Sequence, residues 1–267
     1  MARKIRLDIH LFAAGLVGSR QQAQQLIRAG RVRDKGGKIF DKPGQEVPED
    51  FKPVVKSSRR FVSRGGEKLV AALNEFPIII SGRVCLDGGI STGGFTDCLL
   101  QHDAALVYGI DVGYGQTAWS LRTDPRVVLK ERTNLRNLTS EELYKPKDPR
   151  PDLAVVDLSF ISLRIVLPAI TNLLINQSRE AILLVKPQFE VGREKVGKGG
   201  VVREASAHVN VLKRIIEFSL DQGWTSKGIV ASPITGPAGN HEYLLWLGTN
   251  GPENLPNLEI LVEQTLA

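Results

Sequence analysis

Apolar runs of strand length recur along the chain from residue 84 onward, and segments with apolar residues at helical spacing alternate with them. The runs cover residues 84–87, 105–110, 126–129, 153–157, 181–186, 228–231 and 243–247. Strands that alternate with helices are typical of mostly parallel sheets, because a parallel pair needs a crossover connection. The pattern therefore predicts an α/β domain built on a doubly wound sheet.

The first 60 residues follow a different pattern of shorter elements. Apolar residues at near-helical spacing predict a helix that ends near Gly15, and they are Ile5, Leu7, Leu11 and Phe12. Ser19 followed by Gln22 is a capping-box pattern that opens a second helix. Residues 31–40 read as a hairpin, and a further strand is expected near 54–55. The segment is thus predicted to be a compact α-α-β unit.

The chain is long enough for more than one domain. Its 267 residues exceed the commonest domain size of roughly 100–150, so we expect either one large α/β domain or a small domain and a larger one. No apolar stretch approaches the ~20 residues that span a bilayer, and no signal-type apolar region follows the first residues. We therefore expect a cytoplasmic protein without a membrane partner. Cys85 and Cys98 fall in a predicted strand and on the apolar face of a predicted helix, which favours buried free thiols over a disulfide or metal pair.

The net charge becomes informative when it is divided by position. Residues 1–60 hold 14 Lys/Arg against 6 Asp/Glu, a net charge of +8, whereas the remainder holds 21 against 23, a net charge of −2. Such asymmetry suggests a polyanion-binding module attached to a near-neutral body, because basic patches neutralise phosphates and release counterions. The alternative is a basic face that only keeps the protein soluble.

A glycine-rich turn follows the first strand of the larger domain. The stretch Val84-Cys-Leu-Asp-Gly-Gly-Ile-Ser-Thr-Gly-Gly-Phe-Thr-Asp-Cys-Leu-Leu100 reads as strand, turn and helix. Its glycines would let the backbone pass close to a ligand, and the free N–H groups of the helix would face the same space. The next apolar run ends in Asp111, where a doubly wound sheet delivers a carboxylate to a ribose diol. The pattern predicts a nucleotide-type ligand site; the alternative is a glycine-rich connection without a ligand.

Two later strands end in residues that can do chemistry. Asp157 closes one apolar run and Lys186 closes another, both at the sheet edge where such folds bind ligands. The polar, glycine-rich segment 187–204 is long for a connection and is therefore a candidate substrate-covering loop. Lys68 lies in a predicted helix, and Glu242 lies before the last strand. By themselves, such residues are most often a surface cation and a solvated carboxylate.

The first unit resembles a known RNA-binding domain. Arg6-Leu-Asp8, Gly15-Leu16, Ser19-Arg20, Ala23, Ile27 and Gly30-x-Val32 are similar to the domain found in a small-subunit ribosomal protein of the S-four type and in several rRNA-modifying enzymes. That domain holds structured RNA by shape and by its phosphates. The resemblance implies RNA contacts from basic residues of this unit, namely Arg6, Arg20, Arg28, Arg31, Arg33 and Lys35.

The whole of residues 3–248 resembles one enzyme family. Seven motifs carry the likeness: 63–68 (SRGGEK), 87–95 (DGGISTGGF), 109–115 (GIDVGYG), 131–134 (ERTN), 157–162 (DLSFIS), 186–190 (KPQFE) and 239–242 (GNHE). In this order they strongly resemble the TlyA family of S-adenosylmethionine-dependent rRNA 2′-O-methyltransferases, historically called hemolysins. Three positions depart from the family, which commonly has an apolar residue at Gly88, alanine at Ile90 and tryptophan at Phe61.

The resemblance implies a fold, a reaction and a set of roles. The fold is a Rossmann-like doubly wound methyltransferase sheet with a small N-terminal α+β domain, divided as 1–58, a linker at 59–64, 65–250 and a C-terminal tail at 251–267. The reaction moves a methyl group from S-adenosylmethionine to a ribose 2′-hydroxyl of a cytidine in ribosomal RNA. The partner is therefore ribosomal RNA or a ribosomal subunit. The expected cofactor contacts are Asp87, Gly88, Gly89, Ser91, Gly93, Gly94, Phe95, Asp111, Asn134 and Asp157.

The catalytic tetrad of related 2′-O-methyltransferases, Lys-Asp-Lys-Glu, falls on Lys68, Asp157, Lys186 and Glu242. A ribose hydroxyl is a poor nucleophile until its proton is drawn off, whereas the methyl-bearing sulfonium is already activated. Lys186 is the expected base; if the carboxylates keep it charged, it instead steers the hydroxyl and stabilises developing negative charge. Neither version requires a metal.

Three other functions remain open from the sequence. A pore-forming hemolysin is disfavoured because no secretion signal or membrane segment is found. A non-catalytic rRNA-binding or assembly factor is disfavoured because all four tetrad residues are present. Dinucleotide oxidoreduction is a weaker idea, since the glycine spacing differs from G-x-G-x-x-G. Binding of S-adenosylmethionine separates these functions; the target nucleotide, the ribosomal subunit and the oligomeric state stay open.

Overall fold

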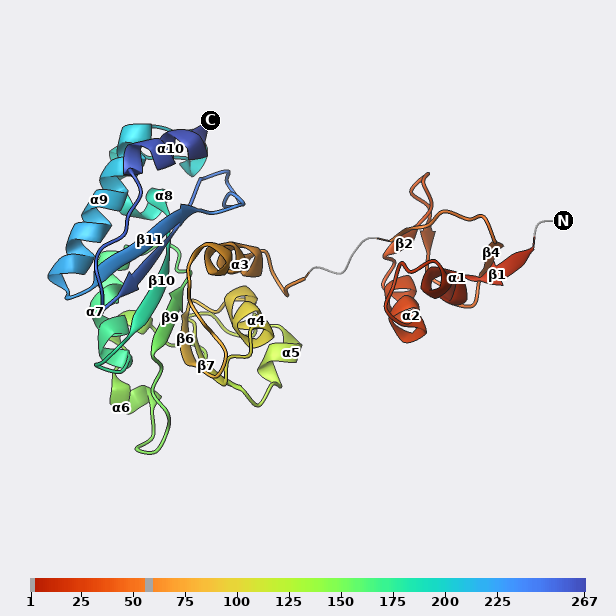
Figure 1. Ribbon diagram of the computed structural model, residues 1–267, viewed down its shortest axis with the longest axis horizontal. Coiled ribbons are helices and arrows are strands. Elements are labelled where there is room, and N and C mark those ends of the chain that lie inside the picture. The colour runs from red at the N-terminus through yellow and green to blue at the C-terminus, as the bar shows by residue number, and fades with distance from the viewer. Residues whose placement is uncertain (1–2, 56–59) are drawn as a thin grey trace. The chain divides into compact units, whose positions relative to one another are not determined.

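The structure, a computed structural model, describes residues 3–55 and 60–267. The chain divides into two compact units, Met1–Arg60 and Phe61–Ala267 (Figure 1). Apolar side chains form a separate buried core in each unit. The predicted linker, 59–64, begins at Arg59, which lies outside the described residues.

The first unit packs two helices against short strands. Its elements are β1 (Lys4–Arg6), α1 (Leu7–Ala13), α2 (Arg20–Arg28), β2 (Val32–Arg33), β3 (Ile39–Phe40), β4 (Glu46–Pro48) and β5 (Val54–Val55). β1 pairs antiparallel with β4, and β2 lies between β3 and β5 in a three-stranded antiparallel sheet. The core is formed by apolar residues of all these layers, including Leu7, Leu11, Ala23, Ile27, Val32, Phe40 and Val47.

The helices and the hairpin of this unit lie where the sequence predicts them, with three differences in detail. Ile5 does not continue the first helix but pairs with Val47 between β1 and β4, and Phe12 is half exposed instead of buried. The capping box is half formed: Ser19 accepts the N–H of Gln22, while the Gln22 side chain accepts the N–H of Gly18. Helix α1 ends two residues before Gly15, which takes the expected positive φ of 68°.

The second unit is built on a seven-stranded sheet. The strands are β6 (Val84–Gly88), β7 (Leu106–Ile110), β8 (Val127–Lys130), β9 (Leu153–Val156), β10 (Glu180–Val185), β11 (Thr225–Ala231) and β12 (Tyr243–Gly248), in the order β11-β12-β10-β9-β6-β7-β8. The five strands from β10 to β8 are parallel, and β12 runs antiparallel between β10 and β11. All seven predicted strands are confirmed, as is the mostly parallel, doubly wound fold class.

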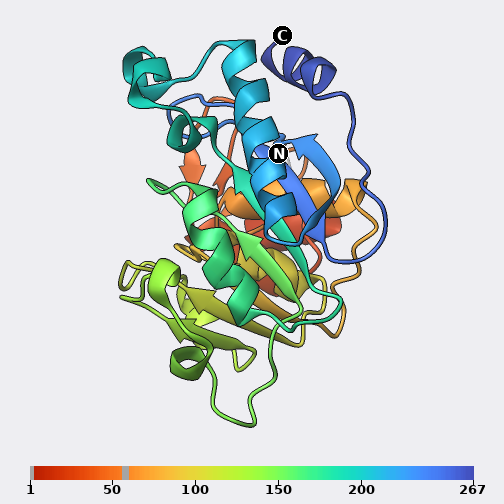
Figure 2. The ribbon, with the colours of Figure 1, turned by 90° about the vertical axis from the view of Figure 1, so that its left-hand side faces the viewer.

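Helices cover both faces of this sheet (Figures 1 and 2). One face packs against α3 (Gly65–Glu75), α4 (Gly94–Gln101) and α5 (Trp119–Arg122), and the other against α6 (Ser140–Leu143), α7 (Leu163–Leu173), α9 (Ala205–Asp221) and α10 (Leu258–Leu266). Successive residues of β9 alternate between the two cores: Val155 lies in the first and Val156 in the second. A short helix, α8 (Pro187–Glu190), and 3-10 turns at Leu135–Asn137, Arg193–Lys195 and Lys198–Gly200 complete the unit.

The order of the strands determines where in the sheet a ligand site is expected. From β6 the chain crosses to β7 on one side, whereas β9 pairs with β6 on the other side. Ligands of open α/β sheets bind at the carboxyl ends of the strands where the order reverses in this way. The glycine-rich turn after β6 and Asp157 after β9 therefore meet at this edge.

The second unit includes residues 61–64 of the predicted linker and the predicted C-terminal tail, which the sequence assigned outside the catalytic domain. Phe61, in the predicted linker, is 2% exposed, and the N–H of Val62 donates to Asp97 at 2.7 Å. The predicted tail, 251–267, ends in α10, whose Leu258 and Val262 are buried in the core.

Other sequence expectations concern cysteines and membranes. Cys85 and Cys98 are buried thiols and not a disulfide, as predicted, and burial raises the pKa of Cys85 to about 12. Within residues 3–55 and 60–267 no helix is both long and apolar enough to cross a membrane. In the same residues no group of three His, Cys, Asp or Glu side chains could hold a metal ion.

Candidate active site

The glycine-rich turn carries the backbone tightly past the end of β9. Gly89 has a φ of +89°, and a Cβ there would lie 2.5 Å from the carbonyl oxygen of Asp157. A Cβ on Gly88 would lie 2.8 Å from the Leu135 side chain. Side chains at the two remaining glycines of the turn, Gly93 and Gly94, would also collide with protein atoms. The glycines thus allow close packing within the protein, and not only the predicted approach of a ligand.

Asp87, the second-last residue of β6, is a fully buried carboxylate. Its Oδ2 atom accepts the backbone N–H of Thr96 at 3.0 Å and the Thr96 hydroxyl at 2.6 Å, whereas Oδ1 is buried without a partner in the described part of the chain. Burial raises the pKa of Asp87 to about 7 against the two Thr96 hydrogen bonds, and the nearby carboxylates of Asp157 and Asp111 add to the increase. Asp87 therefore holds the start of α4 on the end of β6.

A cavity of about 420 Å³ opens beyond the ends of β6, β7 and β9. Asp111, after β7, lines it and accepts the N–H of Ser91 at 2.7 Å and the N–H of Gly113 at 2.6 Å, one on each carboxylate oxygen. Because each oxygen can accept a second hydrogen bond, the carboxylate keeps capacity for a ligand. Apolar side chains form much of the remaining wall, among them Ile110, Leu135, Ile161 and Val166.

A second cavity of about 300 Å³ contains all four residues of the predicted tetrad. Lys68 Nζ lies 2.5 Å from Glu242 Oε2, and Lys186 Nζ lies 2.5 Å from Asp157 Oδ1. Lys68, Lys186 and Glu242 are 8%, 8% and 2% exposed, and Asp157 is half-buried. The two lysines and two carboxylates form two ion pairs with no net charge. Within each pair, the attraction between the charges offsets part of the free energy lost when they leave water.

Four separate elements hold the tetrad in place. Lys68 lies in the first turn of α3, Asp157 follows β9, Lys186 follows β10, and Glu242 precedes β12. Pro187 begins α8 directly after Lys186 and turns the chain away from the sheet.

The two cavities adjoin each other. Gly89, Ser91, Asp157 and Ser159 line both of them. The Ser159 hydroxyl accepts a hydrogen bond from Lys186 Nζ at 3.0 Å. The sequence did not single out Ser159; its place two residues after Asp157, in a segment that follows a strand end, was the available signal.

The predicted cofactor residues occupy three kinds of position. Ser91, Asp111, Asn134, Gly89 and Asp157 line the larger cavity, and Gly94 and Phe95 line the smaller one. Asp87, Gly88 and Gly93 line neither and instead support the turn.

The segment 187–204 is hydrogen-bonded to Asn240 at Gly200 and Val202. Asn240, 1% exposed and two residues before Glu242, accepts the N–H of Val202 at 3.0 Å and donates to the carbonyl of Gly200 at 2.8 Å. No described residue from 188 to 204 lines either cavity.

The candidate RNA-binding residues of the first unit differ in exposure. Arg28 and Lys35 are exposed, whereas Arg31 and Arg33 are half-buried. Arg6 and Arg20 both contact the buried carboxylate of Asp8, a residue to which the sequence assigned no separate role.

Comparisons with known proteins agree with this geometry. The model of the FtsJ-like methyltransferase family matches residues 61–249, and that of the S4 domain matches residues 5–50. The 16S/23S rRNA (cytidine-2′-O)-methyltransferase TlyA of Mycobacterium tuberculosis is 50% identical over 93% of this chain and 91% of that protein. Hemolysin A of Brachyspira hyodysenteriae is 40% identical over 90% of this chain and 98% of that protein. A solved structure of a hemolysin-named protein from Streptococcus thermophilus, 38% identical, has a TM-score of 0.73 and covers 99% of this chain and 96% of that one.

Proposed function

This chain belongs to the FtsJ-like methyltransferase family, and from that premise we propose that it transfers the methyl group of S-adenosylmethionine to the ribose 2′-hydroxyl of a cytidine in ribosomal RNA. The observation that carries the proposal is the tetrad: Lys68, Asp157, Lys186 and Glu242 meet in one cavity that shares a wall with a larger one. The name of the half-identical relative supports ribosomal RNA as the substrate class.

The larger cavity fits the cofactor by the chemistry of its lining. A carboxylate with free acceptor capacity, Asp111, suits the two hydroxyls of a ribose, and apolar walls suit the adenine ring. A volume of about 420 Å³ is within the range of small-molecule sites. We assign Asp111 to the ribose and Asn134 to the same end of the cofactor, with the 88–94 turn toward its methionine end. When bound, S-adenosylmethionine supplies an activated methyl group on a sulfonium.

The smaller cavity would receive the target ribose. Lys186 Nζ contacts Asp157 and Ser159, which uses two of the three donors of an ammonium. The third donor is available to a 2′-oxygen, so Lys186 orients the hydroxyl and stabilises the negative charge that develops there. A neutral Lys186 would instead accept the proton of the hydroxyl. Lys68 and Glu242 hold each other beside this group and close the wall of the cavity.

Methyl transfer to ribosomal subunits tests the proposal. The protein is incubated with small or large subunits and S-adenosylmethionine labelled in the methyl group, and the RNA is then cleaved with alkali. We expect label in RNA and one alkali-resistant phosphodiester bond, because a methylated 2′-oxygen cannot attack the neighbouring phosphate. An RNA with 2′-deoxycytidine at that position should accept no label. Label on a base, or no transfer by a protein that binds the cofactor, would contradict the proposal.

A further inference from the structure

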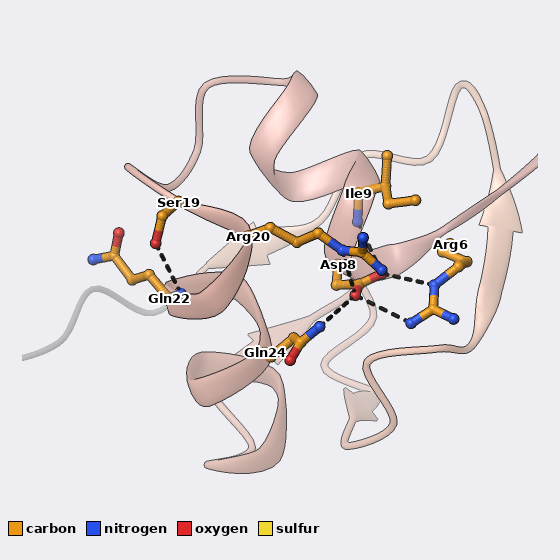
Figure 3. Close-up of polar contacts among 7 residues, drawn as sticks. All are labelled: Arg6, Asp8, Ile9, Ser19, Arg20, Gln22 and Gln24. Atoms are coloured by element: carbon orange, nitrogen blue, oxygen red, sulfur yellow. Dashed lines mark hydrogen bonds and ion pairs between the residues drawn. The ribbon is translucent and has the colours of Figure 1, made fainter.

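Asp8 is a carboxylate at the centre of a polar cluster on the first unit (Figure 3). It lies in α1, is fully buried, and accepts five hydrogen bonds. Arg6 contributes two of them, from Nε at 3.1 Å and from Nη2 at 3.2 Å. Arg20 Nε and Gln24 Nε2, both from α2, donate to Oδ2 at 3.0 and 2.8 Å, and the N–H of Ile9 donates to Oδ1. One side chain thus gathers two guanidinium groups from different elements.

Both arginines stay accessible while they are held. The side chains of Arg6 and Arg20 are 46% and 51% exposed, whereas that of Asp8 is 0% exposed. Arg20 uses only Nε on Asp8, and within residues 3–55 and 60–267 its two Nη groups have no hydrogen-bond partner. A guanidinium binds phosphate through pairs of N–H groups in a fixed plane, so free Nη groups on a fixed plane are suited to phosphate.

Charge explains why the carboxylate is needed. Two guanidinium groups at one site repel each other, and flexible arginines lose side-chain entropy when a ligand orders them. Asp8 lowers both costs before any ligand arrives, and it leaves the cluster with a net charge of +1. Burial alone would raise the pKa of Asp8, but hydrogen bonds from Arg6, Gln24 and Arg20 outweigh burial and hold that pKa well below its usual range. Asp8 therefore stays ionised near neutral pH.

We propose that Asp8 is a positioning residue for RNA binding, which fixes Arg6 and Arg20 as one two-guanidinium site for backbone phosphates of ribosomal RNA. This inference rests on the proposed function, because the ligand is the RNA that the enzyme methylates. The strongly basic first unit, with a net charge of +8 over residues 1–60, agrees with a polyanionic ligand. The negative charge of Asp8 should therefore strengthen binding to RNA, although RNA is itself negatively charged.

That consequence gives a test in which two explanations predict opposite signs. If the unit binds RNA by net charge alone, Asp8→Asn should bind RNA more tightly, as should Asp50→Asn, the matched control at an exposed aspartate of the same unit. If Asp8 positions the two arginines, Asp8→Asn should bind about tenfold more weakly. Its plot of log affinity against log salt should also be flatter by about 1–2, because phosphate contacts set the slope.

The experiment uses the full chain and ribosomal RNA at several salt concentrations, with thermal unfolding measured for each variant. Asp8→Asn binding as tightly as Asp50→Asn, with the wild-type salt slope, would overturn the inference. Should Asp8→Asn fail to fold, Gln24→Leu replaces it, since it removes one hydrogen bond to Asp8 without changing any charge. We expect weaker, less salt-dependent binding from Gln24→Leu in a protein that still unfolds cooperatively, and unchanged binding would equally overturn the inference. A wild-type protein without salt-dependent RNA binding would instead count against the proposed function.

Discussion

Lys68 and Glu242 are 174 positions apart in the sequence, and their side chains meet at 2.5 Å in a buried ion pair. Breaking a buried pair by removing one partner leaves an uncompensated charge, which costs about 3–5 kcal/mol. The pair therefore ties helix α3 to the start of β12, at the wall of the smaller cavity.

Glu242→Gln should accordingly lower the free energy of unfolding by a few kcal/mol. The double variant Lys68→Met with Glu242→Leu should be closer to wild type in stability, because no charge is left unpaired, although it should be inactive. Denaturant unfolding of the double variant and of its two matching single variants, Lys68→Met and Glu242→Leu, gives the coupling energy. Additive effects of the two single changes would show that the ion pair does not contribute to stability.

Asp111 tests the assignment of the larger cavity. Its loss would leave ribose hydroxyls without an acceptor, at a cost of ~1–3 kcal/mol, so Asp111→Ala should weaken S-adenosylmethionine binding roughly ten- to hundredfold. Asp111→Asn, which keeps one acceptor oxygen, should lie between this variant and wild type. Calorimetric titration measures both affinities, and wild-type affinity in Asp111→Ala would rule out the ribose assignment.

The raised pKa of Asp87 predicts how the stability of the protein changes with pH. Its pKa in the folded protein, about 7, is above the ordinary aspartate value of about 3.9 in an unfolded chain. For a pKa raised by folding, the contribution to stability is complete below about pH 4 and is lost as the pH rises through about 7. Asp87→Asn cannot ionise, so its melting temperature should fall less than that of wild type between pH 5 and pH 8. Identical changes in the two proteins would show that Asp87 does not bind its proton more tightly on folding.

Phe61 is the first residue of the second unit, and its side chain is buried there. A Cβ on Gly66 would overlap the Phe61 ring, and Phe61 packs in the same core as Leu69. A chain that begins at Arg60 should fold and bind S-adenosylmethionine, but lose most of its RNA affinity and most of the salt dependence of that affinity. A chain that begins at Ser63 should melt at a lower temperature, because it lacks this buried aromatic ring. Equal salt slopes for the Arg60 chain and the full protein would contradict this division of labour.

The sheet and the strand-end residues of the site were predictable because both follow from local pattern. Buried strands are continuous apolar runs, and a residue that ends such a run, like Asp157 or Lys186, must lie at the carboxyl edge. Lys68 and Glu242 do not end parallel strands, and only the family resemblance linked them to the site.

The remaining features depend on partners that are distant in the sequence. Strands β1 and β4 are three residues each and form through pairs such as Ile5 with Val47. Position 88 requires glycine because a Cβ there would collide with the Leu135 side chain, and no local sequence pattern identifies this contact. Ser159 is an exposed serine, and only the fold brings its hydroxyl to Lys186, so no local sequence pattern shows this contact.

Ser159 can be separated from the tetrad experimentally. Ser159→Ala removes one of the two side-chain acceptors of Lys186 and no charge. We expect a methyl-transfer rate reduced by about tenfold with little change in cofactor affinity, because one hydrogen bond to a charged group is lost. Ser159→Thr keeps the hydroxyl and should recover part of the rate. Full activity in Ser159→Ala would mean that Asp157 alone orients Lys186.

The most direct measurement is the rate of methyl transfer to ribosomal RNA by Lys186 variants, with cofactor and RNA affinities measured in parallel. Lys186→Ala should bind both ligands nearly as wild type does and transfer no methyl group, because the lost interaction matters mainly in the transition state. Lys186→Arg keeps a positive charge that cannot be removed in this pH range, so its failure would indicate a proton-accepting lysine, and its activity a lysine that supplies only charge. Near-wild-type transfer by Lys186→Ala would contradict the account of this site.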